Sequence, residues 1–185
     1  AREPDPVAAG ERSVAIEELD EWAQPAFQGI RMLNRIQSKI FPQAYHTNEN
    51  LLVCAPTGAG KTNIAMLTVL HEIGLHIDEN GDYLPEDFKI VYVAPMKALA
   101  AEVTDAFSRR LAPLDIVVAE LPGDTQMSKR ELEETQMIVT TPEKWDVITR
   151  KGGEVSVAST LRLLIIDEVH LLNDERGPGV ETLVA

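Results

Sequence analysis

Leu51-Leu-Val-Cys-Ala-Pro-Thr-Gly-Ala-Gly-Lys-Thr62 opens with an apolar run, passes through a glycine-rich turn and enters a helical pattern. A strand and a helix therefore flank a tight turn whose successive backbone N–H groups can curl around an anion. The positive end of the helix points to the same place. The stretch predicts a phosphate-binding loop at the end of a buried strand, in an open α/β sheet.

The residue types in this loop suit a nucleotide with a bound metal ion. Lys61 would reach the β- and γ-phosphates, and the Thr62 hydroxyl would hold Mg²⁺. The strict motif opens with glycine, but the small side chain of Ala55 also suits a tight turn. The residues expected to contact the nucleotide here are Ala55, Pro56, Thr57, Gly58, Ala59, Gly60, Lys61 and Thr62.

Short apolar runs alternate with helical patterns on both sides of the loop. The predicted strands are Leu51–Cys54, Ile90–Ala94, Ile116–Ala119, Met137–Thr140 and Leu163–Ile166. The predicted helices are Lys61–Leu75, Lys97–Leu111, Met127–Thr135 and Pro142–Arg150. Strand, helix, strand in repetition predicts a doubly wound, mainly parallel α/β sheet with helices on both faces.

The chain has 185 residues, enough for one well-packed domain. We expect residues 1–12 to be a flexible leader and residues 13–185 to form one domain, incomplete at its C-terminal end. A capped amphipathic pattern over residues 13–26 predicts a helix. A second helical pattern follows Asn34, and Pro42 is expected to end or bend it.

Leu163-Leu-Ile-Ile-Asp-Glu168 adds two adjacent carboxylates at the end of a predicted strand. Open α/β sheets bind their ligands at this end of the strands. Asp167 would coordinate Mg²⁺, and Glu168 would orient and deprotonate an attacking water. Together with the phosphate loop, the pair predicts hydrolysis of ATP with Mg²⁺ as cofactor.

Composition constrains the partners. The chain is 44% apolar and 25% charged, and no apolar run approaches the length of a membrane span. A single cysteine fits a reducing compartment, the nucleus or the cytoplasm. The net charge of −13 argues against non-specific binding of nucleic acid, which depends on clustered lysine and arginine.

Six short motifs follow one another along the chain: Asn34-Arg-Ile-Gln37, Ala55–Thr62, Ala94-Pro-Met-Lys-Ala-Leu-Ala100, Gly123-Asp124, Thr140-Thr-Pro-Glu-Lys-Trp145 and Asp167-Glu-Val-His170. In this order they resemble the motifs of superfamily 2 DExH-box helicases, in particular the first RecA-like domain of the large two-cassette helicases of the activating signal cointegrator complex and the spliceosomal snRNP. The sequence departs from the family pattern at Pro122, which precedes Gly123-Asp124, and at Gly179 in Arg176-Gly-Pro-Gly179.

The resemblance implies an ATP-dependent motor that unwinds RNA or DNA, with a single strand next to a duplex as substrate and 3′ to 5′ polarity. Gln37 would read the adenine edge, and His170 would couple ATP state to a second RecA-like domain. The nucleic-acid contacts would be Pro95, Lys97, Gly123, Asp124, Thr141, Pro142 and Lys144.

These contacts would use backbone N–H groups and helix N-termini, so they do not require a positive net charge. The resemblance also implies further helicase domains and a multi-subunit complex, with no membrane partner. Because the arginine finger would come from the second RecA-like domain, we expect this chain alone to turn over ATP very slowly. Two alternatives stay open: a translocase or remodeller that never separates strands, and a non-hydrolysing scaffold.

Overall fold

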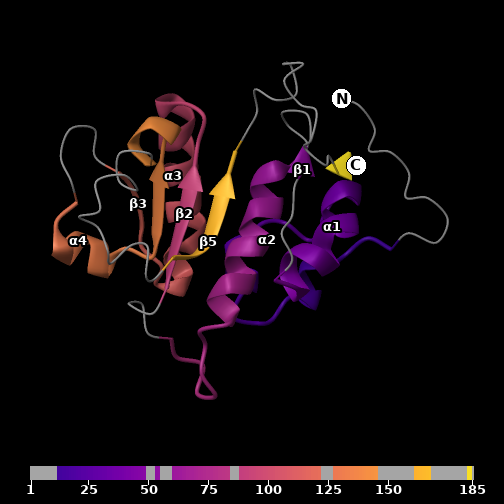
Figure 1. Cartoon of the computed structure of the whole chain (residues 1–185). Helices are drawn as coiled ribbons and strands as arrows, with labels where there is room; N and C mark the ends of the chain where they lie inside the picture. Colours follow the sequence, from indigo (N-terminus) through magenta and orange to yellow (C-terminus); the bar gives the residue numbers. More distant parts are fainter. Residues whose placement is uncertain are drawn as a thin grey trace.

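The computed structural model describes residues 12–48, 53–54, 60–83, 88–121, 127–145, 161–167 and 183–184. Its central feature is a four-stranded sheet in the order β3-β4-β2-β5, in which every neighbouring pair is parallel (Figure 1). A separate parallel pair joins β1 to β6. The strands are β1 Val53–Cys54, β2 Lys89–Val93, β3 Val118–Glu120, β4 Met137–Thr140, β5 Leu161–Ile166 and β6 Leu183–Val184.

Helices cover both faces of this sheet. Ile90 and Tyr92 of β2 belong to a core that also contains residues of α2 (Lys61–Gly74) and α3 (Lys97–Leu111). Val91 and Val93 face the other way and pack with Leu132 of α4 (Lys129–Glu134). Strands buried on both faces read as continuous apolar runs, which is how β2 and β4 appear in the sequence. The doubly wound α/β prediction is confirmed.

α2 and α3 follow their predictions closely, whereas α4 is shorter at both ends than the predicted Met127–Thr135. α2 and α4 each begin for a local reason. α2 follows Gly60, whose φ of 83° places the chain in the left-handed region that favours glycine. α4 begins at a capping box in which Ser128 and Glu131 exchange side-chain and backbone hydrogen bonds. Residues 142–145 are helical as predicted, and the predicted remainder to residue 150 lies outside the described residues.

The predicted helix over residues 13–26 is wrong. Two short 3-10 helices stand there instead, η1 (Ile16–Glu18) and η2 (Gln24–Phe27). The backbone N–H of Ile16 donates to Arg31, and that of Leu33 donates to Val14. The second of these long-range bonds occupies the Val14 carbonyl, which an α-helix would use as an acceptor for its own ladder.

Pro42 does not end the second helix, since α1 spans Arg35–His46 with Pro42 inside it. Phe41 before the proline and Ala44 and Tyr45 beyond it are buried on one face of α1, and α2 lies beside this helix in Figure 1. Burial of this apolar face outweighs the hydrogen bond that proline cannot donate.

The strand predicted at Ile116–Ala119 is displaced to Val118–Glu120. The backbone N–H of Val117 donates to the side-chain oxygen of Gln136, and that of Ile116 donates to Leu111. Those two bonds fix the chain before it can enter the strand.

Candidate nucleotide and nucleic-acid site

Gly60, Lys61 and Thr62 form the junction between the glycine-rich loop and α2. Gly60 is the N-cap of α2 and makes no side-chain cap, and no acidic residue stands in the first turn. The first N–H groups of the helix therefore face no competing carboxylate of the helix itself. Lys61 is half-buried and Thr62 is exposed. Ala55, Pro56, Thr57, Gly58 and Ala59 lie outside the described residues.

Gln37 connects the start of α1 to this junction. Its side-chain oxygen accepts from the Asn34 backbone N–H at 3.0 Å, and its Nε2 donates to the Gly60 carbonyl at 3.1 Å. The residue is 3% exposed. A Cβ on Gly60 would lie 2.0 Å from Gln37 Nε2, so only glycine lets the two segments approach this closely. The adenine contact expected of Gln37 stays a prediction.

Asp167 lies at the carboxyl end of β5. Its backbone N–H donates to Val93 at 2.9 Å, which extends the parallel ladder by one bond. Its Oδ2 accepts a hydrogen bond of 2.8 Å from the phenol of Tyr92 on β2. Burial, and next the nearby Asp167 carboxylate, raise the pKa of the Tyr92 phenol. Tyr92 is therefore a neutral donor to a carboxylate at the edge of the sheet.

Tyr92 is not among the site residues predicted above, although the sequence carries a signal for it. It is the one polar-tipped side chain in the middle of an aliphatic run, Ile90-Val-Tyr-Val93. A buried tyrosine hydroxyl usually finds a partner. Parallel pairing with the strand that carries Asp167 identifies that partner, and pairing is visible only in the structure.

Two of the segments expected to contact nucleic acid follow adjacent strands. Pro95 and Lys97 come after β2, whereas Thr141, Pro142 and Lys144 come after β4. The two strands are parallel neighbours, with Val93 opposite Thr140, so both segments leave the same edge of the sheet. Lys97 and Pro142 are exposed, and Thr141 is 5% exposed.

Lys144 makes a contact that its sequence position does not reveal. Its Nζ donates to the carbonyl of Leu121 at 3.2 Å. Leu121 also extends the β3–β4 ladder through its own N–H. The lysine thus ties the helical start after β4 to the exit of β3. Gly123 and Asp124, like Glu168 and His170, lie outside the described residues.

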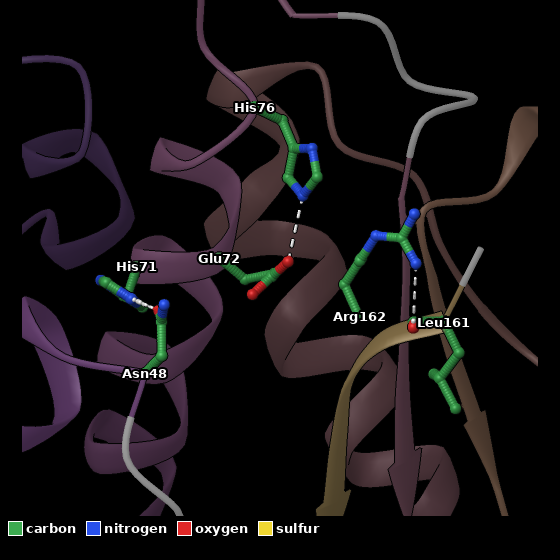
Figure 2. Close-up of polar contacts among 6 residues, drawn as sticks. All are labelled: Asn48, His71, Glu72, His76, Leu161 and Arg162. Atoms are coloured by element: carbon green, nitrogen blue, oxygen red, sulfur yellow. Dashed lines mark hydrogen bonds and ion pairs between the residues drawn. The ribbon is translucent and has the colours of Figure 1, made fainter. Parts of the chain in front are cut away.

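His71 of α2 and His76, which follows the helix, contact side chains of the surrounding structure. In Figure 2 His71 points to Asn48, and His76 points back to Glu72, four residues earlier in α2. His76 also stacks on Phe88, with ring centroids 4.6 Å apart. Within the described part of the chain no three His, Cys, Asp or Glu residues are grouped to hold a metal ion. Mg²⁺ does not need such a cage, since it binds through one or two protein oxygens and substrate phosphates.

No helix in the described ranges is long and apolar enough to cross a membrane.

The parallel sheet, the glycine-started α2 and the carboxylate at the end of β5 together define a RecA-like α/β domain. Residues 34–185 match the DEAD/DEAH box helicase family, and the chain belongs to that family.

Curated relatives cover almost the whole chain. DExH-box ATP-dependent RNA helicase DExH14 of Arabidopsis thaliana is 67% identical over 185 residues, covering 98% of this chain and 8% of its own length. Activating signal cointegrator 1 complex subunit 3 of Homo sapiens is 63% identical, covering 99% and 8%. The U5 small nuclear ribonucleoprotein 200 kDa helicase of Caenorhabditis elegans is 56% identical, covering 100% and 9%. The chain therefore spans less than a tenth of these relatives, and the group matches the predicted resemblance.

Solved structures agree on the fold. A structure of Mss116p bound to ssRNA and AMP-PNP superposes with a TM-score of 0.69 at 18% identity, covering 92% of this chain and 36% of that one. A hypothetical ATP-dependent RNA helicase from Sulfolobus tokodaii gives 0.62 at 25% identity, covering 84% and 43%. These similarities confirm the RecA-like fold class.

Proposed function

We propose that this chain is the ATP-binding half of an ATP-dependent nucleic-acid helicase, which couples ATP hydrolysis to strand unwinding with a second RecA-like domain. The observation that carries the proposal is the shared edge of the sheet. Three neighbouring parallel strands each end in a segment of the proposed site: β4 is followed by Thr141–Lys144, β2 by Pro95–Lys97 and β5 by Asp167. The segments expected to bind nucleic acid therefore lie beside Asp167, the carboxylate expected to hold the metal ion of the nucleotide.

The residues present fit a magnesium nucleotide. The first turn of α2 carries Lys61 and no acid, and Gly60 packs against Gln37 too closely for any larger residue. Lys61 would bind the β- and γ-phosphates, while Thr62 and Asp167 would hold the metal ion. Mg²⁺, when bound, neutralises charge on the phosphates as the γ-phosphoryl group is transferred. Glu168 would orient the attacking water, and His170 would pass the ATP state to the partner domain.

The nucleic-acid strand would be held mainly by its phosphates. The exposed Lys97 stands at the first position of α3, where the helix dipole favours an anion. Pro95, Gly123, Asp124, Thr141 and Pro142 would supply backbone contacts, and Lys144 would contribute while holding Leu121. Phosphate contacts do not distinguish RNA from DNA, so the proposed substrate is a single strand of either, read 3′ to 5′.

The relatives' names support further proposals about partners. One relative is a subunit of a cointegrator complex and another is part of a small nuclear ribonucleoprotein. We propose that this chain likewise works with further helicase domains within a multi-subunit assembly, in the nucleus, the cytoplasm or both.

Strand separation by the complete protein tests this function. Asp167→Asn removes the proposed metal-ligand charge without changing side-chain size, so we expect it to reduce nucleic-acid-stimulated ATP hydrolysis and unwinding by at least about 100-fold. Glu133→Gln makes a matched control, because this carboxylate is exposed on α4.

Three results separate the candidate functions. Unwinding that Asp167→Asn abolishes supports the helicase. ATP-driven movement or remodelling without strand separation favours a translocase, in keeping with the same motifs. Activity that survives Asp167→Asn contradicts the motor assignment altogether.

A further inference from the structure

We propose that Tyr92 is a positioning residue for the nucleotide-bound metal: its phenol holds the Asp167 carboxylate in the orientation that binds Mg²⁺. This inference rests on the proposed function and adds a residue to it. Its basis is a single hydrogen bond of 2.8 Å from Tyr92 Oη to Asp167 Oδ2.

Sheet register brings the two side chains together. Tyr92 of β2 lies opposite Ile165 of β5, so both side chains stand on the same face. Asp167 comes two residues after Ile165 and points to that face again, because side chains alternate along an extended chain. The tyrosine therefore reaches along the sheet to the next same-face position on the neighbouring strand.

The phenol is held firmly enough to orient its partner. Tyr92 is 7% exposed and belongs to the main core. Its ring lies 6.0 Å from that of Phe107 of α3, itself 1% exposed. The Asp167 end is fixed as well, through its backbone bond to Val93. Both ends of the hydrogen bond are thus fixed by packed or paired structure.

The hydrogen bond uses Oδ2 and leaves Oδ1 for the metal ion or its bound water. Mg²⁺ demands near-ideal octahedral geometry, so a carboxylate that rotates freely is a poorer ligand than one held in place. Partners of this kind typically change metal affinity about 10- to 100-fold when removed. Tyr92 would not touch the nucleotide, so its effect should appear in metal dependence rather than in nucleotide contact.

Tyr92→Phe deletes one oxygen atom and keeps the packed ring. The matched control is Tyr45→Phe, because Tyr45 Oη of α1 donates to Asp20 Oδ2 at 2.7 Å in a second tyrosine–aspartate pair. In the complete protein, we would titrate Mg²⁺ at a fixed concentration of a non-hydrolysable ATP analogue and measure analogue binding. A parallel titration in EDTA would report nucleotide contact without metal.

We expect Tyr92→Phe to raise the Mg²⁺ concentration at half-saturation by about 10-fold or more. Analogue binding in EDTA should stay within about two-fold of the unsubstituted protein, and Tyr45→Phe should match that protein in both titrations. An unchanged Mg²⁺ requirement in Tyr92→Phe overturns the inference. So does equal weakening with and without metal, which would indicate a general structural role.

The unsubstituted protein separates this inference from the proposed function. If it shows no Mg²⁺-dependent analogue binding, the proposed function fails, and the Tyr92 inference fails with it. If it binds normally and Tyr92→Phe behaves in the same way, only the Tyr92 inference fails.

Discussion

At the scale of single residues, Gly60 shows why the loop ends in glycine. The residue has a positive φ of 83° and lies against the amide of Gln37. Any Cβ would meet that amide at 2.0 Å. Displacing Gln37 would break its bond to the Gly60 carbonyl and its capping bond to Asn34. One glycine therefore supports the starts of both α1 and α2.

We expect Gly60→Ala to destabilise the chain by about 2–4 kcal/mol. About 1–2 kcal/mol arises from a non-glycine residue in the left-handed region, and the remainder from the displaced Gln37. Gly81→Ala is the matched control, because Gly81 has a φ of 80° and open space around its Cβ position. Denaturant unfolding of the two variants measures the difference. Equal losses would contradict a special role for the Gly60–Gln37 contact.

The sequence predicts which residues belong to the site, whereas only the structure reveals the partners that hold them. Motif spacing alone predicts site roles for Gly60, Lys61 and Asp167, and these roles stay predictions. The partners of these residues cannot be predicted in this way. Gln37 bonds to Gly60 across 23 positions, and Tyr92 bonds to Asp167 across 75. Such contacts depend on helix packing and strand register, which no local pattern encodes.

At the scale of secondary-structure elements, Arg110 links three segments. Its Nε donates to the Ala26 carbonyl of η2 at 2.8 Å, and its NH1 donates to Asn63 of α2 at 2.7 Å. The guanidinium also lies 4.8 Å from the Phe27 ring centroid. Burial lowers the pKa of Arg110. The last turn of α3 is thus joined to the residue that follows Thr62.

Arg110→Met should destabilise the chain by about 2 kcal/mol, because two charged hydrogen bonds and a cation–π contact are lost while the aliphatic bulk is retained. The neighbouring Arg109 is the control, since it is 71% exposed and its ion pair within the described residues is with Asp105, one turn away. Arg109→Met should change stability by no more than about 0.5 kcal/mol. Thermal unfolding of the pair gives the comparison, and similar midpoints would refute the linking role of Arg110.

Elements were predictable to different degrees for physical reasons. β4 matches its prediction at both ends, because a doubly buried strand appears as an uninterrupted apolar run. Residues 13–26 do not match their predicted helix, since their local bonds form only short 3-10 turns while Val14 and Ile16 bond to Leu33 and Arg31. A helical apolar period alone does not distinguish these two outcomes.

At the scale of the whole molecule, the charge of −13 and the proposed nucleic-acid contacts are compatible. The two described segments that are proposed to contact nucleic acid follow β2 and β4 at one edge of the sheet, and α3 begins at the same edge. A surface built from helix dipoles and a few lysines can hold phosphates without an overall positive charge. High affinity for nucleic acid would then depend on further domains of the proposed helicase.

Under the proposed function, catalysis would also be divided between two domains. This chain carries the residues proposed to bind the nucleotide, and the proposed partner domain would complete the site around the γ-phosphate. Nucleotide binding is therefore the property that the chain itself should show, and it is the central claim.

Calorimetric titration of the chain with ADP and Mg²⁺ tests that claim most directly, with Lys61→Ala as the test variant. Lys129→Ala is the matched control, because both lysines are the first residue of their helix. We predict saturable binding by the chain and by Lys129→Ala. Lys61→Ala should bind at least about 10-fold more weakly, because this variant lacks the charge-assisted bond from Lys61 to phosphate. Equal affinity in all three, or no binding by the unsubstituted chain, would contradict the account.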